Sequence, residues 1–208
     1  MEHIQLALQD YVPNQGVKET DRCASVALLL RQGDDGPEVL FIQRAQHPED
    51  PWSGNLGFPG GRIDPKDSGP LATAIRETAE EVGIILTHDQ LLAQLDDQQG
   101  VRVAVQVCCY VFIVDRAVQV RGNNEVAQAF WVSLRQLQEQ ERHCRREIDW
   151  HGTLTEVPSI YLNEAVPVLW GLTYRFVVTF FQWGLTYRFV VTFFQAVSIE
   201  FINFRCLS

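Results

Sequence analysis

The chain has 208 residues, of which 46 % are hydrophobic, and its formal net charge at pH 7 is −9. This length and composition predict one domain with extensions and a sizeable core. The negative charge, with no basic patch in the sequence, argues against a general binder of nucleic acid or of anionic membranes. An anionic small substrate stays compatible with it, because a bound metal ion can invert the local field.

The five cysteines show no paired metal-ligand spacing, and their number is odd. A reduced, cytoplasmic setting is the simplest account of them. The first residues lack the pattern of a signal peptide. Polar and charged residues interrupt the apolar C-terminal stretch, so we expect no membrane span.

The first part of the chain predicts an extension followed by a hairpin. Residues 1–20 are expected to be peripheral, and apolar residues alternate with polar ones over positions 4–8. Residues 24–31 and 39–44 are rich in Val, Leu and Ile and predict two strands joined by a Gly- and Pro-containing turn. A polar loop over residues 47–57 follows.

Residues 70–82 predict the helix around which the chain is organised. Pro70 suits the first turn, Gly83 suits the C-terminal cap, and residues 67–69 offer three choices of N-cap. The apolar stripe expected to face the core recurs at helical spacing and consists of Leu71, Ile75, Ala79 and Val82.

Three glutamates, Glu77, Glu80 and Glu81, share another face of this helix. Their mutual repulsion and the helix dipole both disfavour such a cluster near the C-terminal end. A counter-charge is therefore expected, either Arg76 or a hard divalent cation such as Mg²⁺. A solvated acidic helix face is the alternative. The glycine pair ending at Gly61 favours the ligand hypothesis, because glycine lets backbone approach a ligand closely.

The segments Phe-Pro-Gly-Gly at 58–61 and Arg-Glu-x-x-Glu-Glu-x-Gly at 76–83 together resemble the signature of Nudix hydrolases. Three positions depart from that signature. Asp67 stands where it has Glu, the gap that follows is one residue longer, and Thr78 replaces an apolar residue. The first two departures resemble the coenzyme A pyrophosphatase branch of the family.

The resemblance implies an α/β/α sandwich with a mixed sheet, and hydrolysis of a pyrophosphate bond in a nucleoside diphosphate derivative. It implies that Mg²⁺ or Mn²⁺ is held by Glu77 and Glu81, helped by Glu80 and the Gly61 carbonyl. Arg76 would orient Glu77 or its neighbours, because its planar fork suits bidentate contact with carboxylates.

Three further residues are candidates for the site. Arg44 fits a run that precedes the signature in the coenzyme A branch, although Ile42 stands where that branch has Thr and its downstream Arg is absent. Trp52 could stack on a base or simply anchor its loop. Glu125 is a candidate extra carboxylate near the metal, and either it or a signature glutamate could be the general base. The alternative for Glu125 is a solvated loop residue.

Downstream of the helix, the apolar run over residues 101–114 predicts a central strand that is covered on both faces. The other predicted elements are an amphipathic stretch (87–97), short strands (118–121, 127–132, 147–150 and 157–162) and a helix (134–142).

Residues 183–195 repeat residues 170–182 without a change. Thirteen residues turn a helix by roughly 220° beyond full turns, and an odd shift flips a strand, so both copies cannot extend one apolar face. We interpret the repeat as a tandem duplication with no catalytic role. Its uncharged, β-prone centre carries a risk of aggregation or pairing. The predicted organisation is an extension (1–20), a Nudix domain (21–182), and a duplicated segment with a tail (183–208).

Several alternatives stay open at this stage. Coenzyme A or an acyl-coenzyme A is the first substrate candidate, and ADP-ribose or another nucleotide sugar is the second. A Nudix-fold protein that binds a nucleotide without turnover, and a protein inactivated by its duplication, are competing hypotheses. The expected partner is a small nucleotide-derived substrate, with no nucleic acid and no membrane, and a homo-oligomer is compatible with the sequence.

Overall fold

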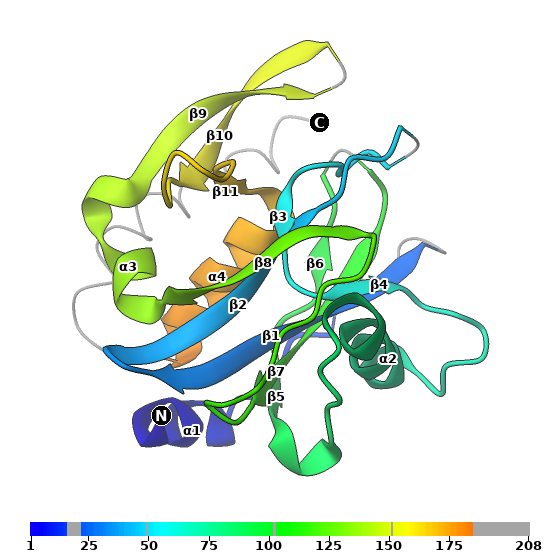
Figure 1. Cartoon of the computed structure of the whole chain (residues 1–208), viewed down its shortest axis with the longest axis vertical. Coiled ribbons are helices and arrows are strands. Elements are labelled where there is room, and N and C mark those ends of the chain that lie inside the picture. The colour runs from blue at the N-terminus through cyan, green and yellow to red at the C-terminus, as the bar shows by residue number, and fades with distance from the viewer. Residues whose placement is uncertain (16–21, 49, 102, 151, 185–208) are drawn as a thin grey trace.

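The computed structural model describes residues 1–15, 22–48, 50–101, 103–150 and 152–184. A mixed sheet lies between two helical layers, which confirms the predicted α/β/α sandwich (Figure 1). None of the helices in these ranges is long and apolar enough to cross a membrane.

Strand β1 (Cys23–Gly33) lies inside the larger sheet, parallel to β7 (Gln106–Ile113) and antiparallel to β2 (Gly36–Arg44). The other strands of this sheet are β3 (Leu56–Gly57), β4 (Gly60–Arg62), β5 (Leu91–Gln94), β6 (Gln98–Gln99) and β8 (Val126–Ser133). Their order is β3-β2-β1-β7-β5, while β4 also pairs with β1, β6 with β7 and β8 with β2. The predicted hairpin of β1 and β2 is confirmed.

Both faces of this sheet are covered, which explains the unbroken apolar runs in its inner strands. Along β1, Leu28 and Leu30 enter the larger core cluster, while Ala27 and Leu29 enter a smaller cluster beneath α2 (Pro70–Val82). Strand β7 is buried over all but its last residue, as expected for a central strand. It begins five residues later than predicted, at Gln106.

Helix α2 has the predicted C-terminal cap, since Gly83 adopts a left-handed conformation with φ of 71°. Its N-cap is Gly69, one of the three predicted choices. The buried face differs from the predicted stripe, because Leu71 and Ile75 are only half-buried at its edge. Polar residues can take part in this face when they are hydrogen-bonded. Its buried residues are Thr73, Ala74, Thr78, Glu81 and Val82.

Within the described residues 1–15, the N-terminal segment is not peripheral, which corrects the sequence-based expectation. It forms helix α1 (Glu2–Gln9), which packs against α4 (Gly171–Gly184) on the face of the sheet opposite α2 (Figure 1). Ile4 and Leu8 are buried, whereas Leu6 is 66 % exposed. The four-residue spacing of the two buried side chains is helical, so the apparent alternation was misleading.

Two further predictions need correction. Residues 118–121 form no strand, because the segment crosses the end of α2 and Arg121 donates its backbone N–H to the Val82 carbonyl. The helix predicted over 134–142 is interrupted by extended backbone at Glu139. It consists of α3 (Leu134–Gln138) and a 3-10 turn, η2 (Gln140–Arg142).

The remaining predictions hold in part. The amphipathic stretch forms a 3-10 turn, η1 (His88–Gln90), and then β5. Strands β9 (His143–Trp150) and β10 (Thr153–Ile160) are longer than predicted and form a hairpin. Strand β11 (Leu169–Trp170) pairs with β10 and completes the smaller sheet.

The first copy of the repeat leads from β11 into α4, which fills the larger core cluster. Residues 185–195 of the second copy lie outside the described residues, so its predicted behaviour stays a prediction. The predicted organisation of the chain into extension, domain and tail also stays a prediction.

Candidate active site

The signature residues meet where the second half of α2 passes strand β4. Glu81 is only 2 % exposed, and its Oε2 accepts a hydrogen bond of 2.8 Å from the Gly60 backbone N–H. Its Oε1 lies 3.8 Å from Nη1 of Arg44. Burial raises the pKa of Glu81 to about 7, against the opposing effects of Gly60 and Arg44. The site therefore contains a buried carboxylate whose negative charge is only partly compensated.

Glu77 lies against the backbone of Gly61. A Cβ atom at position 61 would come within 2.5 Å of the Glu77 carboxyl group. Glycine at this position therefore leaves room for the carboxyl group in its present place. Burial raises the pKa of Glu77, while the hydrogen bond and charge of Arg76 oppose that shift. Glu80, whose side chain is 56 % exposed, lies one turn away at the rim. The backbone of Gly61 and the carboxyl group of Glu77 therefore lie in close contact.

The Arg76 guanidinium links three carboxylates. Its Nη1 donates to Glu77 Oε1 at 2.9 Å and to Glu80 Oε2 at 3.0 Å. Its Nε and Nη2 donate to the two oxygens of Asp67 at 3.0 and 2.9 Å. Asp67 also accepts a hydrogen bond of 2.7 Å from the Thr73 hydroxyl. Arg76 therefore faces its partners from a fixed position, as a planar fork allows.

Asp67 is the site residue whose role the sequence did not show. From the sequence, Asp67 was one of three candidate N-cap residues and a departure from the signature. In the structure, its carboxylate binds the guanidinium of Arg76 and holds it in place. Hydrogen bonds from Arg76 and Thr73 hold the pKa of Asp67 well below its usual range. Its place in the signature, nine residues before Arg76, was the one available signal.

Asp67→Ala is expected to lower turnover about 10- to 100-fold, because outer contacts that orient functional side chains typically contribute that much. The loss should arise from a freely moving Arg76, without loss of the fold. Steady-state kinetics and circular dichroism of the purified variant measure both quantities. Asp64→Ala is the matched control, since its carboxylate accepts from the Lys66 backbone in the same loop. Equal turnover of Asp67→Ala and wild type would contradict the anchoring role.

The three further candidates, Arg44, Trp52 and Glu125, come from segments outside α2 and β4. Glu125 is exposed in the turn that precedes β8, and its charge adds to the upward pKa shifts of both Glu77 and Glu81. Its backbone carbonyl accepts from the N–H of Ala45, which follows Arg44. Strands β2 and β8 therefore bring Arg44 and Glu125 to the signature glutamates.

Arg44 and Trp52 are tied to their loop. Arg44 Nε donates to Asp50 Oδ2 at 2.8 Å, and the Trp52 backbone N–H donates to Asp50 Oδ1 at 3.0 Å. The half-buried Trp52 ring packs against the larger core cluster. These contacts agree with a loop anchor, and a substrate-stacking role for Trp52 stays a prediction.

The donor groups of the site fit a hard divalent cation. Across the described part of the chain, no three acidic, His or Cys side chains already converge at a metal-binding distance. Arg76 instead occupies the facing oxygens of Glu77 and Glu80. The charges of Glu77 and Glu125 nevertheless oppose ionisation of the buried Glu81. A cation among these oxygens would relieve that repulsion, and carboxylate oxygen is the ligand type that Mg²⁺ prefers.

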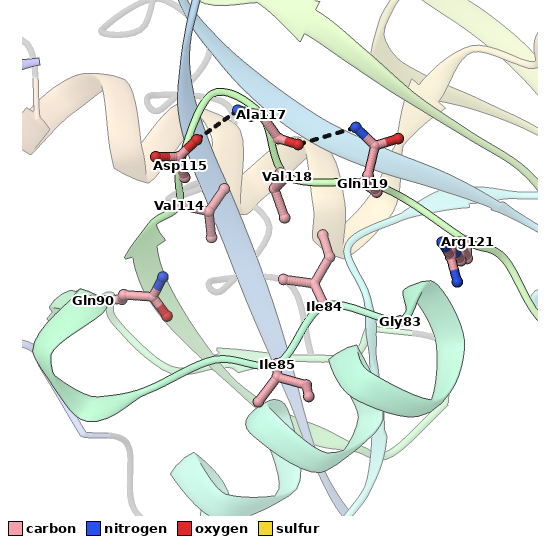
Figure 2. Close-up of a pocket in the computed structure, with 10 residues that line it drawn as sticks. All are labelled: Gly83, Ile84, Ile85, Gln90, Val114, Asp115, Ala117, Val118, Gln119 and Arg121. Atoms are coloured by element: carbon pink, nitrogen blue, oxygen red, sulfur yellow. Dashed lines mark hydrogen bonds between the residues drawn. The ribbon is translucent and has the colours of Figure 1, made fainter.

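A separate open pocket of about 480 Å³ lies at the C-terminal end of α2 (Figure 2). Ile84, Ile85 and Val118 supply apolar walls, and Asp115 and Arg121 supply its charges. None of the four glutamates lines it, so this pocket is distinct from the acidic site.

Comparisons with known proteins agree with this arrangement. Residues 21–150 match the NUDIX domain family model. An uncharacterized protein of Schizosaccharomyces pombe is 31 % identical over 166 residues, which cover 68 % of this chain and 50 % of that protein. An uncharacterized Nudix hydrolase of Yersinia enterocolitica is 32 % identical over 141 residues, which cover 66 % of this chain and 69 % of that protein. The chain thus spans about half the length of the yeast relative.

Among solved structures, a MutT/nudix family protein from Enterococcus faecalis superposes with a TM-score of 0.56 at 17 % identity. The match covers 87 % of this chain and 67 % of that one. At this identity the likeness bears on the fold alone.

Proposed function

The chain belongs to the Nudix family, and from this premise we propose that it hydrolyses the pyrophosphate bond of a nucleoside diphosphate derivative, using a divalent metal ion. The observation that carries the proposal is the buried Glu81 carboxylate, held on the Gly60 N–H beside Glu77. A buried carboxylate with like charges around it is costly unless a cation joins it. The complete set of signature glutamates argues against a protein that only binds a nucleotide.

Glu77 and Glu81 would hold Mg²⁺ or Mn²⁺, assisted by Glu80 and the Gly61 carbonyl. When bound, the ion would offset phosphate charge and lower the pKa of water. Arg76 keeps Glu77 and Glu80 oriented through its own attachment to Asp67.

The reaction itself needs a base and a water molecule. A signature glutamate or Glu125 would take a proton from the water as its oxygen attacks one phosphorus. The bridging P–O bond then breaks, and the second phosphate leaves with the other half of the substrate. Glu125 is exposed and therefore open to solvent, as a base that exchanges protons requires.

Coenzyme A or an acyl-coenzyme A is the first substrate candidate, because of the Asp67-to-Arg76 spacing. The Trp-Gly-x-Thr segment at 170–173 resembles the start of the last helix in that branch, but the contacts of its side chains are structural. Trp170 Nε1 donates to Asn55 Oδ1 at 3.1 Å, and the Thr173 hydroxyl donates to the Leu56 carbonyl at 3.2 Å. ADP-ribose or another nucleotide sugar is the alternative substrate class.

A panel of coenzyme A, acetyl-coenzyme A, ADP-ribose, NADH and a diadenosine polyphosphate tests this function. We expect hydrolysis of one class with Mg²⁺ or Mn²⁺, and loss of more than about 90 % of it when EDTA is in excess. Chromatography of the nucleotide products identifies the bond that is broken. Hydrolysis that continues unchanged in EDTA would contradict the metal-dependent mechanism. Nucleotide binding without turnover would favour the binding-protein alternative.

A further inference from the structure

Helix α4 packs against α1, β6, β10 and β11, and we call the space that it fills the α4 slot. The first copy of the repeat supplies the buried side chains of this slot, while Trp183, the exposed first residue of the second copy, lies with its ring 5.4 Å from that of Tyr11. Arg175 Nη1 donates to the Gln99 carbonyl at 2.7 Å, and Gln98 Nε2 donates to the Thr179 hydroxyl at 3.5 Å. The apolar contacts come from side chains that are at most 3 % exposed: Tyr174, Phe176, Val177, Phe180 and Phe181.

Every one of these first-copy side chains recurs thirteen residues later in the sequence. The turn from β11 into α4 also depends on a residue that the repeat supplies twice. Gly171 has a φ of +66°, which side-chain-bearing residues rarely adopt, and its counterpart is Gly184. The counterparts of the slot residues are Tyr187, Arg188, Phe189, Val190, Thr192, Phe193 and Phe194.

We propose that the α4 slot accepts either copy of the repeat, so that one chain can fold in two registers. In the second register, residues 184–195 fill the slot and residues 171–183 form a loop. Strand β11 keeps its place in both registers. Leu169 is fully buried there, whereas the residue thirteen positions later is the polar Gln182.

The two registers are not equally populated. The first register requires no additional loop, while the second must close a loop of 13 residues between fixed ends. Loop closure scales as the 3/2 power of loop length, which disfavours the second register by about fiftyfold. This preference agrees with the described α4, which begins at Gly171.

This redundancy limits the damage that a change in the first copy can do. Truncating a buried Phe to Ala ordinarily lowers the folding equilibrium constant by about 10²- to 10³-fold or more. In this chain, the second register becomes the more stable one once the substitution lowers the folding constant of the first register by more than the roughly fiftyfold cost of closing the loop. The folding constant therefore falls by no more than about fiftyfold, whichever slot residue of the first copy is changed.

Urea unfolding of Phe180 variants tests the proposal, because Phe180 is 1 % exposed in the slot. Phe180→Asp in the full chain is expected to remain folded, with its folding constant lowered by about fiftyfold. Phe193→Asp, the same change in the second copy, should stay within about twofold of wild type. The double variant should be unfolded, since neither register then has an intact helix.

A chain shortened by thirteen residues is the matched control. Deleting either copy yields the same sequence, so this chain has one register only. Phe180→Asp should unfold it, and the milder Phe180→Ala should cost it more than the same change costs the full chain. The proposal is overturned if Phe180→Asp or Phe180→Ala damages the full chain as much as the shortened one. Rescue that depends on protein concentration would also overturn it, because the slot would then be filled by another molecule.

Discussion

Glu81→Gln is expected to lower turnover by about 10³-fold or more while the fold stays intact. The variant loses the charge that a cation needs, and metal stabilisation of a transition state is worth several kcal/mol. It keeps an amide oxygen that can accept the Gly60 N–H bond, so the contact between α2 and β4 survives. Steady-state kinetics at saturating Mn²⁺ measure the loss, with Glu147→Gln on an exposed strand as the matched control.

The same variant is expected to be at least as stable as wild type in metal-free buffer at high pH. Burial raises the folded-state pKa of Glu81 from 4.5 to about 7. A raised carboxyl pKa contributes stability below the unfolded value, and that contribution is lost as pH rises through the folded value. Wild type should thus lose on the order of 2–3 kcal/mol between pH 4.5 and 7 from this group, and Glu81→Gln should not. Urea unfolding in EDTA at both ends of this range, with the variant as reference, measures the difference. Turnover of Glu81→Gln equal to that of wild type would contradict the assignment of Glu81 to the metal site.

Gly60→Ala is expected to remove most of the stability of the domain, a loss of more than about 4 kcal/mol. The added Cβ would lie 2.3 Å from the Ser25 carbonyl oxygen and 2.6 Å from the Val26 Cα. Both atoms belong to the backbone of β1, which pairing with β7 holds in place. Gly60 also has a φ of +153°, which alanine rarely adopts.

Gly61→Ala provides the contrast, because its Cβ meets the Glu77 carboxyl group at 2.5 Å instead of backbone. The Glu77 side chain can rotate away, so this variant should fold and lose about 100-fold in turnover through a misplaced ligand. Thermal unfolding and kinetics of the two variants, measured side by side, separate the effects. Equal stability of Gly60→Ala and wild type would show that β4 does not approach β1 as described.

The helix and its carboxylates could be predicted from sequence because their determinants are local. The Pro70 and Gly83 boundaries follow from backbone chemistry, and the glutamate spacing places the carboxylates by helical geometry alone. Which face of the helix is buried could not be predicted in the same way. It includes Glu81 because the Gly60 N–H lies opposite, and that contact joins residues 21 positions apart.

The errors at the N-terminus and at residues 118–121 have the same origin. Ile4 and Leu8 find their partners in α4, more than 160 residues away in the sequence, so local alternation could not reveal the helix. The Val-rich segment at 118–121 has suitable β propensity but no neighbouring strand, and strand propensity depends on such neighbours. Asp67 likewise gained its role from the position of Arg76 in the folded chain.

We propose that Glu77 and Glu81 bind the divalent ion on which pyrophosphate hydrolysis depends. Titrating Mn²⁺ into the protein, with electron paramagnetic resonance and turnover recorded on the same samples, tests it most directly. Turnover is expected to rise in step with bound Mn²⁺, and Glu81→Gln is expected to weaken both by at least about tenfold. Unchanged Mn²⁺ binding in Glu81→Gln, or turnover in wild type without bound metal, would contradict it.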